Sequence, residues 1–133
     1  MLGSTQQHRE AQTTREATRL MASPFACGVL LTIQGRLDAT AARRLLDLAQ
    51  ATLPPSPAAL VVDLTTTTGL DAFGRAVLRR IIRHAGRRGT AVYLAAKPRT
   101  QRELGSIAEG AAHPRIVPRK RVAIAAAIAA SAR

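Results

Sequence analysis

Residues 59–64 read Ala-Leu-Val-Val-Asp-Leu, a run of apolar residues that is interrupted only by Asp63. Apolar residues at consecutive positions, rather than at every second one, are typical of a strand that is buried on both faces. Such strands belong to sheets that are covered by helices. The run therefore predicts an α/β domain built around a parallel or mixed sheet.

Strands and helices are predicted to alternate on both sides of this run. Helical periods, β-rich apolar runs and the Gly and Pro residues between them set the boundaries. Strands are expected at 29–33, 59–64, 90–95 and 116–117, and helices at 40–53, 72–85, 99–108 and 122–132. The predicted fold class is thus α/β, with a single mixed sheet of about four strands covered by about four helices.

The helix predicted at 72–85 is strongly amphipathic. At about 100° per residue, Phe73, Val77 and Ile81 fall on the same half of the helix as its other apolar residues. The opposite half carries four arginines: Arg75, Arg79, Arg80 and Arg83. We expect the apolar half, including Phe73, to pack on the sheet, and the arginines to face solvent or a partner.

Positive charge is concentrated in the second half of the chain. The sequence has 20 Lys and Arg against 8 Asp and Glu, which gives a net charge of +12. Residues 75–102 contain nine of the basic residues and no acidic one. This distribution indicates an acidic partner, such as a protein face, a nucleic acid or an anionic membrane. A basic face that contacts only solvent explains the charge equally well.

Aromatic residues are scarce, which weakens one of these alternatives. The chain has two Phe, one Tyr and no Trp. Proteins that bind single strands stack the bases on aromatic rings, and the sequence has no helix-turn-helix or RNA-binding signature. We therefore expect any nucleic-acid binding to be weak and non-specific, and favour an acidic protein as the partner.

The sequence lacks the marks of a secreted or membrane-spanning protein. Its longest charge-free apolar run, 122–132, is shorter than the roughly 20 residues that cross a bilayer. The first residues have no apolar signal-peptide core, and the single cysteine, Cys27, cannot form an internal disulfide. We expect one domain with a cytoplasmic location.

No catalytic constellation is visible in the sequence. The P-loop, dinucleotide-binding and GxSxG motifs are absent, and His8, His84 and His113 have no second ligand at metal-binding spacing. Asp38 and Asp71 each precede a predicted helix, where a carboxylate caps backbone N–H groups. Capping alone would explain both residues, and a functional role is the alternative. We expect no enzyme activity, cofactor or metal.

Four segments, in order, resemble the STAS domains, a family of sulfate-transporter and anti-sigma-factor-antagonist domains. The segments are GRLD at 35–38, VVDLT at 61–65, DAFG at 71–74 and RRGTAVYL at 87–94. They resemble the family's G-E-L-D helix start, its V-V-[LD]-D-L-S strand end, its D-S-S-G or D-S-x-G loop and its G-x-x-L-x-L strand. The resemblance covers residues 25–130, nearly the whole chain beyond the first 24 residues.

The resemblance implies a protein-interaction module. Anti-sigma-factor antagonists bind an anti-sigma factor, which is also a kinase, through the loop and first turns of the second helix, and thereby release a sigma factor for transcription. Carried over by position, and with Arg79 added from the arginine-rich face, the partner-binding residues here are Asp38, Asp71, Ala72, Phe73, Gly74, Arg75 and Arg79.

One position departs from the antagonist pattern in a way that affects regulation. Ala72 stands where antagonists carry the Ser or Thr that the kinase phosphorylates, so the usual phosphoswitch is lost. Thr65 to Thr68, in the adjoining loop, are alternative sites of modification, although a role as ordinary loop residues is the plainer interpretation. The family's first strand is either supplied by residues 15–21 or lost.

Two other functions are compatible with the same sequence. One is a STAS-like accessory subunit of a membrane transporter, which would dock on an ATPase or carrier. The other is a basic, nucleic-acid-associated scaffold protein. The oligomeric state, monomer or homodimer, stays open.

Residues 1–24 are polar and lack apolar periodicity, so we predict a flexible tail at 1–24 and a domain at 25–133. Deletion of residues 1–14 should leave the thermal unfolding transition nearly unchanged, because this segment offers no apolar face to bury. A large drop in the unfolding temperature of the truncated chain would show that the segment packs on the domain.

Overall fold

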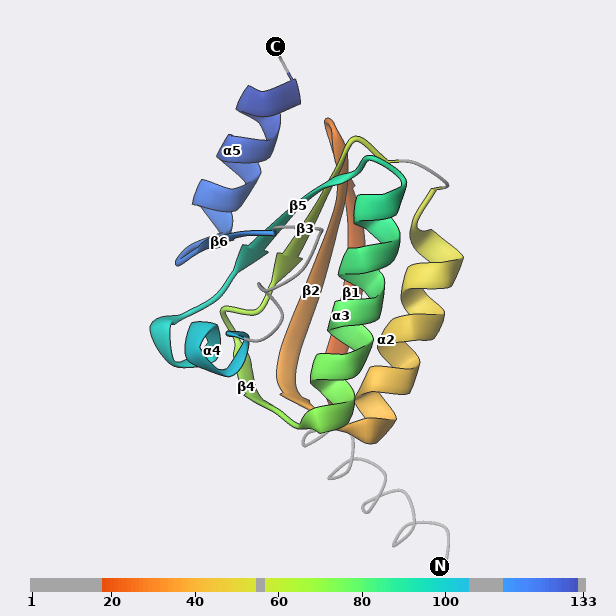
Figure 1. The fold of residues 1–133 in the computed structure, drawn as a ribbon, viewed down its shortest axis with the longest axis vertical. Helices are drawn as coiled ribbons and strands as arrows, with labels where there is room; N and C mark the ends of the chain where they lie inside the picture. Colours follow the sequence, from red (N-terminus) through yellow and green to blue (C-terminus); the bar gives the residue numbers. More distant parts are fainter. Residues whose placement is uncertain (1–17, 55–56, 106–113, 132–133) are drawn as a thin grey trace, which may run out of the picture.

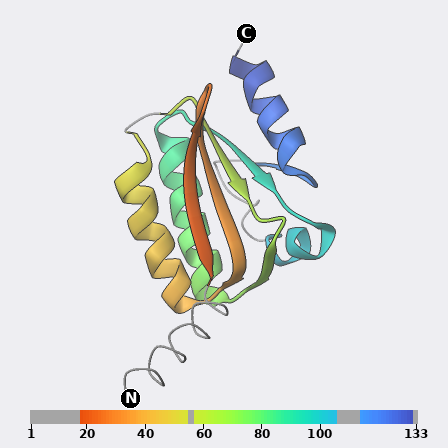
Figure 2. The same cartoon turned by 180° about the vertical axis from the view of Figure 1, so that it is seen from behind.

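The computed structural model describes residues 18–54, 57–105 and 114–131. The strands in these residues are β1 (Arg19–Phe25), β2 (Gly28–Leu37), β3 (Ala59–Asp63), β4 (Thr67–Leu70), β5 (Ala91–Ala95) and β6 (Arg115–Val117). The helices are α2 (Ala39–Thr52), α3 (Ala72–Arg87), α4 (Pro98–Glu103) and α5 (Lys120–Ser131). The predicted α/β class is confirmed: α2 and α3 lie side by side on one face of a single sheet, and α5 covers part of the other face (Figures 1 and 2).

The sheet is mixed. Its strand order is β1-β2-β3-β5-β6, and β4 pairs with β2 outside this path. β1 is antiparallel to β2, and the other pairs are parallel. β2 pairs with β3 along its first half and with β4 along its second half. The C-terminal ends of β2 and β4 therefore lie together, which sets where α2 and α3 begin.

The central strand, β3, is buried on both faces, as the sequence predicts. All of its residues are buried. Leu60 and Val62 belong to the core beneath α2 and α3, whereas Ala59 and Val61 pack with Ala123 of α5. Apolar residues are needed at consecutive positions when helices cover both faces of a strand, so the sequence run and the architecture agree.

The described sheet has six strands rather than the predicted four, and β1 is one of the two additional strands. It pairs with β2 from Arg19 opposite Gln34 to Phe25 opposite Gly28. The strand that the resemblance implies is therefore present at 19–25, and the domain boundary predicted at residue 25 lies too late. Residues 1–17 of the predicted tail lie outside the described residues.

The pattern of apolar residues in β1 explains why the sequence did not clearly identify this segment as a strand. Leu20 and Ala22 pack against the core beneath α2 and α3, whereas Met21, which points to the opposite face, is 55% exposed. On the opposite face only Phe25 packs against a core cluster, and Ser23 and Pro24 interrupt the β-rich composition. The second additional strand, β4, consists of residues predicted as a threonine-rich loop.

The third predicted helix is shorter than expected. α4 ends at Glu103 rather than at residue 108, and a turn follows at Leu104 and Gly105. Glycine is a poor helix former, so the interruption at Gly105 ends the helix. Residues 106–108 of the prediction lie outside the described residues.

Phe73 does not join the core, so the prediction of a core anchor is wrong. Its side chain is 65% exposed, whereas Gly74, Leu78 and Ile81 of the same helix are buried. The cause is the close approach of α3 to the end of β2: a Cβ atom on Gly74 would lie 2.4 Å from the carbonyl oxygen of Leu37. The glycine faces the sheet at this end of the helix, and the phenylalanine ring therefore projects outward.

This contact predicts that Gly74→Ala destabilises the protein. In an unhindered helix, replacing Gly by Ala stabilises by up to about 1 kcal/mol. Here the new methyl group would overlap a backbone oxygen that has no room to move, so we expect a loss of about 1–3 kcal/mol. Urea denaturation measures the difference.

Gly69→Ala is the matched control for this substitution. A Cβ atom at Gly69 would meet only the side-chain Cγ of Arg36, at 3.9 Å. We expect this variant to differ from the parent by less than about 0.5 kcal/mol. A gain in stability for Gly74→Ala would contradict the close contact.

Candidate partner-binding surface

The two long helices begin next to each other at one end of the sheet (Figure 1). Asp38 follows β2 and Asp71 follows β4, and the last residues of these strands, Leu37 and Leu70, are register partners. The backbone N–H of Asp71 also donates a hydrogen bond to the carbonyl of Leu37, at 3.3 Å. The strand pairing therefore brings together two residues that are 33 positions apart in the sequence.

Both carboxylates cap a helix, as predicted from their positions. Asp38 Oδ1 accepts a hydrogen bond from the N–H of Ala41 at 3.0 Å, and Asp71 Oδ1 accepts one from the N–H of Gly74 at 2.9 Å. Each negative charge also faces the positive end of a helix dipole. These two acids therefore shape the surface, and their oxygens are already engaged by their own helices.

Four exposed residues lie around these caps: Ala39 and Thr40 of α2, and Ala72 and Phe73 of α3. We call them the helix-start surface. Its largest member is Phe73, one of four large apolar side chains that are exposed in the described part of the chain. Exposed aromatic residues are enriched at the centres of protein interfaces. An exposed aromatic ring beside two capped helix N-termini is a suitable contact point for a partner.

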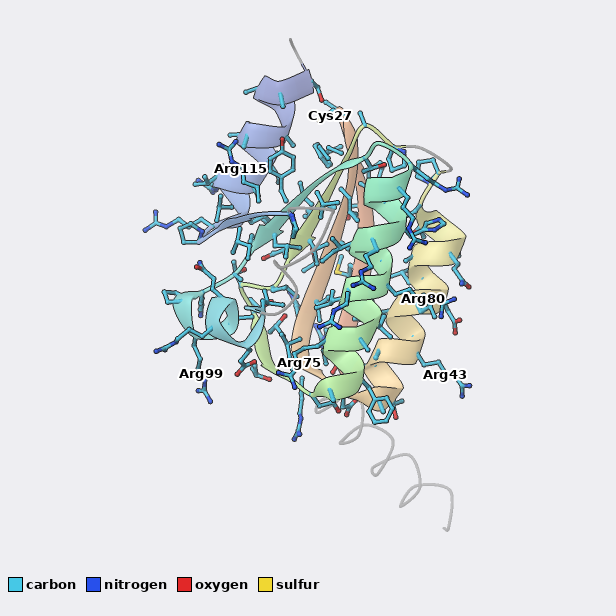
Figure 3. All side chains as sticks on the ribbon, viewed as in Figure 1. Cys27, Arg43, Arg75, Arg80, Arg99 and Arg115 are labelled. Atoms are coloured by element: carbon cyan, nitrogen blue, oxygen red, sulfur yellow. The ribbon has the colours of Figure 1, made fainter. Side chains whose placement is uncertain are left out.

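The remaining predicted site residues do not lie beside Phe73. Gly74 is buried against Leu37, so it positions the helix rather than contacting a partner. Arg75 and Arg79 follow Phe73 by two and six residues, which places them about 200° and about 240° around the helix axis from the ring. Figure 3 shows Arg75 on the side of α3 that faces away from α2. The predicted site therefore divides into an apolar patch and a basic flank.

Ala72 is exposed in the first turn of α3, where it offers only a methyl group. The alternative modification sites nearby have structural roles. The Thr65 hydroxyl donates to Asp63 Oδ1 at 2.6 Å, and the Thr67 hydroxyl donates to the carbonyl of Ile33 at 2.8 Å. These bonds fasten the loop to the sheet and support the plainer interpretation of the threonines. Modification of this loop stays a prediction.

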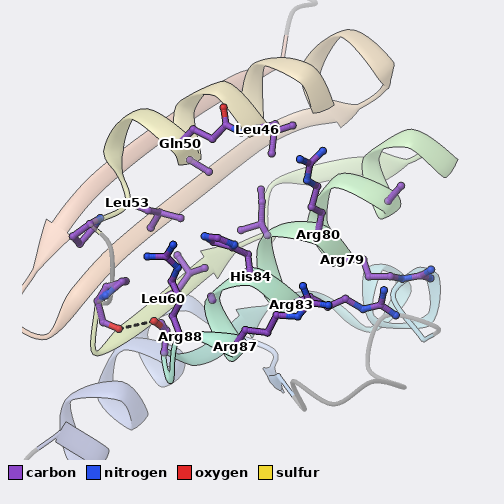
Figure 4. Close-up of a pocket in the computed structure, with 17 residues that line it drawn as sticks. Leu46, Gln50, Leu53, Leu60, Arg79, Arg80, Arg83, His84, Arg87 and Arg88 are labelled. Carbon is purple, nitrogen blue, oxygen red and sulfur yellow. Dashed lines mark hydrogen bonds between the residues drawn. The ribbon is translucent and has the colours of Figure 1, made fainter.

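A second surface feature, which the sequence did not predict, lies between α2 and α3. A cavity of about 680 Å³ opens between the C-terminal half of α2 and the middle and end of α3 (Figure 4). We call it the α2–α3 groove. The sequence signal for it is weak: Leu46 of α2 and Leu53 just after this helix pack against the core but stay partly exposed.

No three His, Cys, Asp or Glu side chains in the described part of the chain come together in a way that could hold a metal ion. None of the helices found there has the length and apolar character needed to cross a bilayer.

Solved structures share this fold. An anti-sigma factor antagonist from Mycobacterium paratuberculosis superposes with a TM-score of 0.70 at 20% identity, over 85% of this chain and 96% of that one. The STAS domain of a SulP transporter from Vibrio cholerae gives 0.59 at 20% identity, over 77% and 82%. The murine anion transporter Slc26a9 gives 0.72 at 12% identity, over 96% of this chain and 25% of the transporter. No curated protein sequence matches at a significant level.

The fold thus defines the class that anti-sigma factor antagonists share with transporter STAS domains. A family model described as "Mlab, STAS domain" matches residues 22–109. The chain therefore belongs to the STAS domain family, and the predicted family is confirmed.

Exposure of Phe73 leads to a prediction about stability. Truncation of a buried Phe costs about 3–5 kcal/mol, but the exposed ring should cost less than about 1 kcal/mol in Phe73→Ala. Leu78→Ala is the matched control on the same helix, because Leu78 is 1% exposed. It should cost about 2–5 kcal/mol in the same urea titration. Equal losses for the two variants would show that the ring is buried in solution.

Proposed function

We propose that the chain is a non-enzymatic protein-binding module that acts in the cytoplasm as an anti-sigma-factor antagonist. It binds an anti-sigma factor, itself a kinase, and regulates transcription by partner switching. The proposal is supported by family membership and by the similarity to antagonist structures over nearly their full length. The proposed contact is the helix-start surface with its capping residues Asp38 and Asp71, flanked by Arg75 and Arg79.

The exposed ring of Phe73 is the observation that carries this proposal. The large apolar side chain of Phe73 is 65% exposed to water, which is unfavourable. Burial of a fully exposed Phe contributes about 1.5–3 kcal/mol, and burial of the exposed part of this ring contributes a corresponding share. The surroundings favour such burial, because the carboxylates of Asp38 and Asp71 already satisfy backbone donors of both helix ends. Each cap removes one unpaired backbone donor from the surface, which lowers the desolvation cost that opposes binding.

The basic flank adds long-range attraction to an acidic partner. Arg75 and Arg79 lie on α3 beside Ala72, and no acidic residue occurs between positions 72 and 102. Charges of one sign accelerate association with an oppositely charged face, and this acceleration falls with ionic strength. In the proposed complex, Phe73 provides the apolar contact and the arginines orient the encounter.

An accessory role in a membrane transporter is the second candidate. It is favoured by the similarity to the SulP transporter STAS domain and to Slc26a9. The partner would then be a transporter ATPase or carrier. A nucleic-acid scaffold has less support, because Tyr93 is buried and Phe25 is half-buried, which leaves Phe73 as the single exposed aromatic ring for base stacking.

The proposed contact predicts that Ala72→Asp folds normally but binds poorly. The free N–H groups in the first turn of a helix favour a negative charge, so stability should stay the same or rise by a few tenths of a kcal/mol. In the complex, the same carboxylate would be buried without a partner, so the affinity should fall about tenfold or more. Thermal unfolding and isothermal titration against the anti-sigma factor kinase encoded nearest to this chain measure the two effects.

Ala125→Asp is the charge-matched control, because Ala125 is exposed on α5, which covers the opposite face of the sheet. It should leave the affinity unchanged. Ala72→Ser restores a hydroxyl group that a kinase partner could phosphorylate, which mass spectrometry detects. Full affinity of a well-folded Ala72→Asp chain would place the interface elsewhere, and binding to a transporter ATPase instead of the kinase would select the second candidate.

A further inference from the structure

The α2–α3 groove combines an aliphatic floor with a cationic rim. Its floor and α2 wall include Leu46, Leu53 and Leu60, and its α3 side includes Arg80 and His84. Figure 4 shows Arg80, His84 and Arg88 on the side of α3 that faces α2, whereas Arg79 and Arg83 point away from α2. The cavity volume of about 680 Å³ is in the range of small-molecule sites.

The charge of the groove is one-sided. Among the described residues, five arginines and one histidine line it, and no carboxylate does. The acids of the described chain are mostly used elsewhere: Asp38 and Asp71 cap helices at the other end of α2 and α3, and Asp63 accepts bonds from Thr65. Asp47 lies on α2 but is not among the lining residues. An anionic group in the groove would therefore meet a positive field.

The residues that line the groove also indicate the chemical nature of the rest of the ligand, apart from its anionic group. Apart from the imidazole of His84, the lining has no aromatic ring on which a nucleotide base could stack. The hydroxyl of Thr90 is already engaged, because it donates to the carbonyl of Pro57 at 2.7 Å. Besides the cationic side chains, Gln50 is the other long polar side chain of the described lining, whereas leucine, isoleucine, alanine and proline side chains offer apolar contact. This composition fits an alkyl chain.

We propose that the α2–α3 groove binds a single-chain lipid with an anionic headgroup. The chain lies on the leucine floor, and Arg80 and His84 at the rim bind the carboxylate or phosphate. The groove uses the C-terminal half of α2, and the helix-start surface lies at the opposite end of the same helices. Arg79 alone both lines the groove and flanks the proposed partner contact. Because Arg80 belongs only to the groove, substitution of Arg80 tests the lipid site independently of the proposed partner.

A tryptophan reporter tests binding directly. The chain has no Trp, and Gln50 is an exposed residue that lines the groove. In the full-length Gln50→Trp variant, titration with oleate or oleoyl lysophosphatidate, below micelle-forming concentrations, should shift the fluorescence in a saturable way with one lipid per chain. Both headgroups support the site, and the tighter one identifies the natural headgroup chemistry. Thermal unfolding verifies that the variant is folded.

Two arginine substitutions in this reporter background separate the groove from general charge attraction. Arg80→Gln removes a rim charge and should weaken lipid binding by roughly fivefold to tenfold. Arg43→Gln removes the same charge from an exposed position of α2 that does not line the groove, and should leave binding unchanged. Monoolein, which has the chain without the charge, should bind more weakly than oleate.

Three results would overturn the lipid site. The first is the absence of saturable binding of either lipid to the folded reporter variant. The second is an equal loss for Arg80→Gln and Arg43→Gln, which would mean that the lipid responds only to net charge. The third is binding of ATP as tight as that of oleate, which would show that the groove recognises anions without an acyl chain.

Discussion

The backbone carbonyl of Leu37, at the end of β2, holds the functional end of the molecule together. It accepts a hydrogen bond from the N–H of Asp71 at 3.3 Å, and it lies so close to Gly74 that no side chain fits between them. This contact fixes where α3 starts and how the helix is rotated about its axis. The orientation of α3 about its axis decides which of its side chains are buried. Leu78 and Ile81 lie in the core, whereas Phe73 and the arginines lie outside it.

The same rotation separates two chemically different surfaces on one pair of helices. At their first turns, α2 and α3 present satisfied caps, small side chains and one aromatic ring. Toward their other ends, leucines and arginines surround the α2–α3 groove, without a carboxylate. Acidic residues are few, and those nearest the first surface serve as caps, so α3 keeps an excess of positive charge.

The sequence predicted elements whose signals were local and strong. Consecutive apolar residues at 59–64 identified the doubly covered strand, and the positions of Asp38 and Asp71 identified two caps. It left β1 open, as a strand at 15–21 or a lost strand, and it did not predict β4, because the edge strand and the short threonine-rich strand have weak local patterns. Phe73 was misplaced for a different reason: helical periodicity gives an apolar arc, but only the tertiary contact of Gly74 with Leu37 decides which residues of that arc meet the sheet.

In the proposed complex, Ala72 and Phe73 both affect how readily the helix-start surface is buried against a partner. A hydroxyl at position 72 could be phosphorylated. The resulting dianion would oppose the burial of the neighbouring Phe73 ring. Alanine removes that opposition, and the exposed phenylalanine adds apolar area that favours burial in every state of the chain. A ligand or modification shifts a binding equilibrium only by its differential effect on the bound and free states. Because position 72 carries no group that changes charge, control of this contact has to come from the partner, from the amount of each protein, or from a modification elsewhere on the chain.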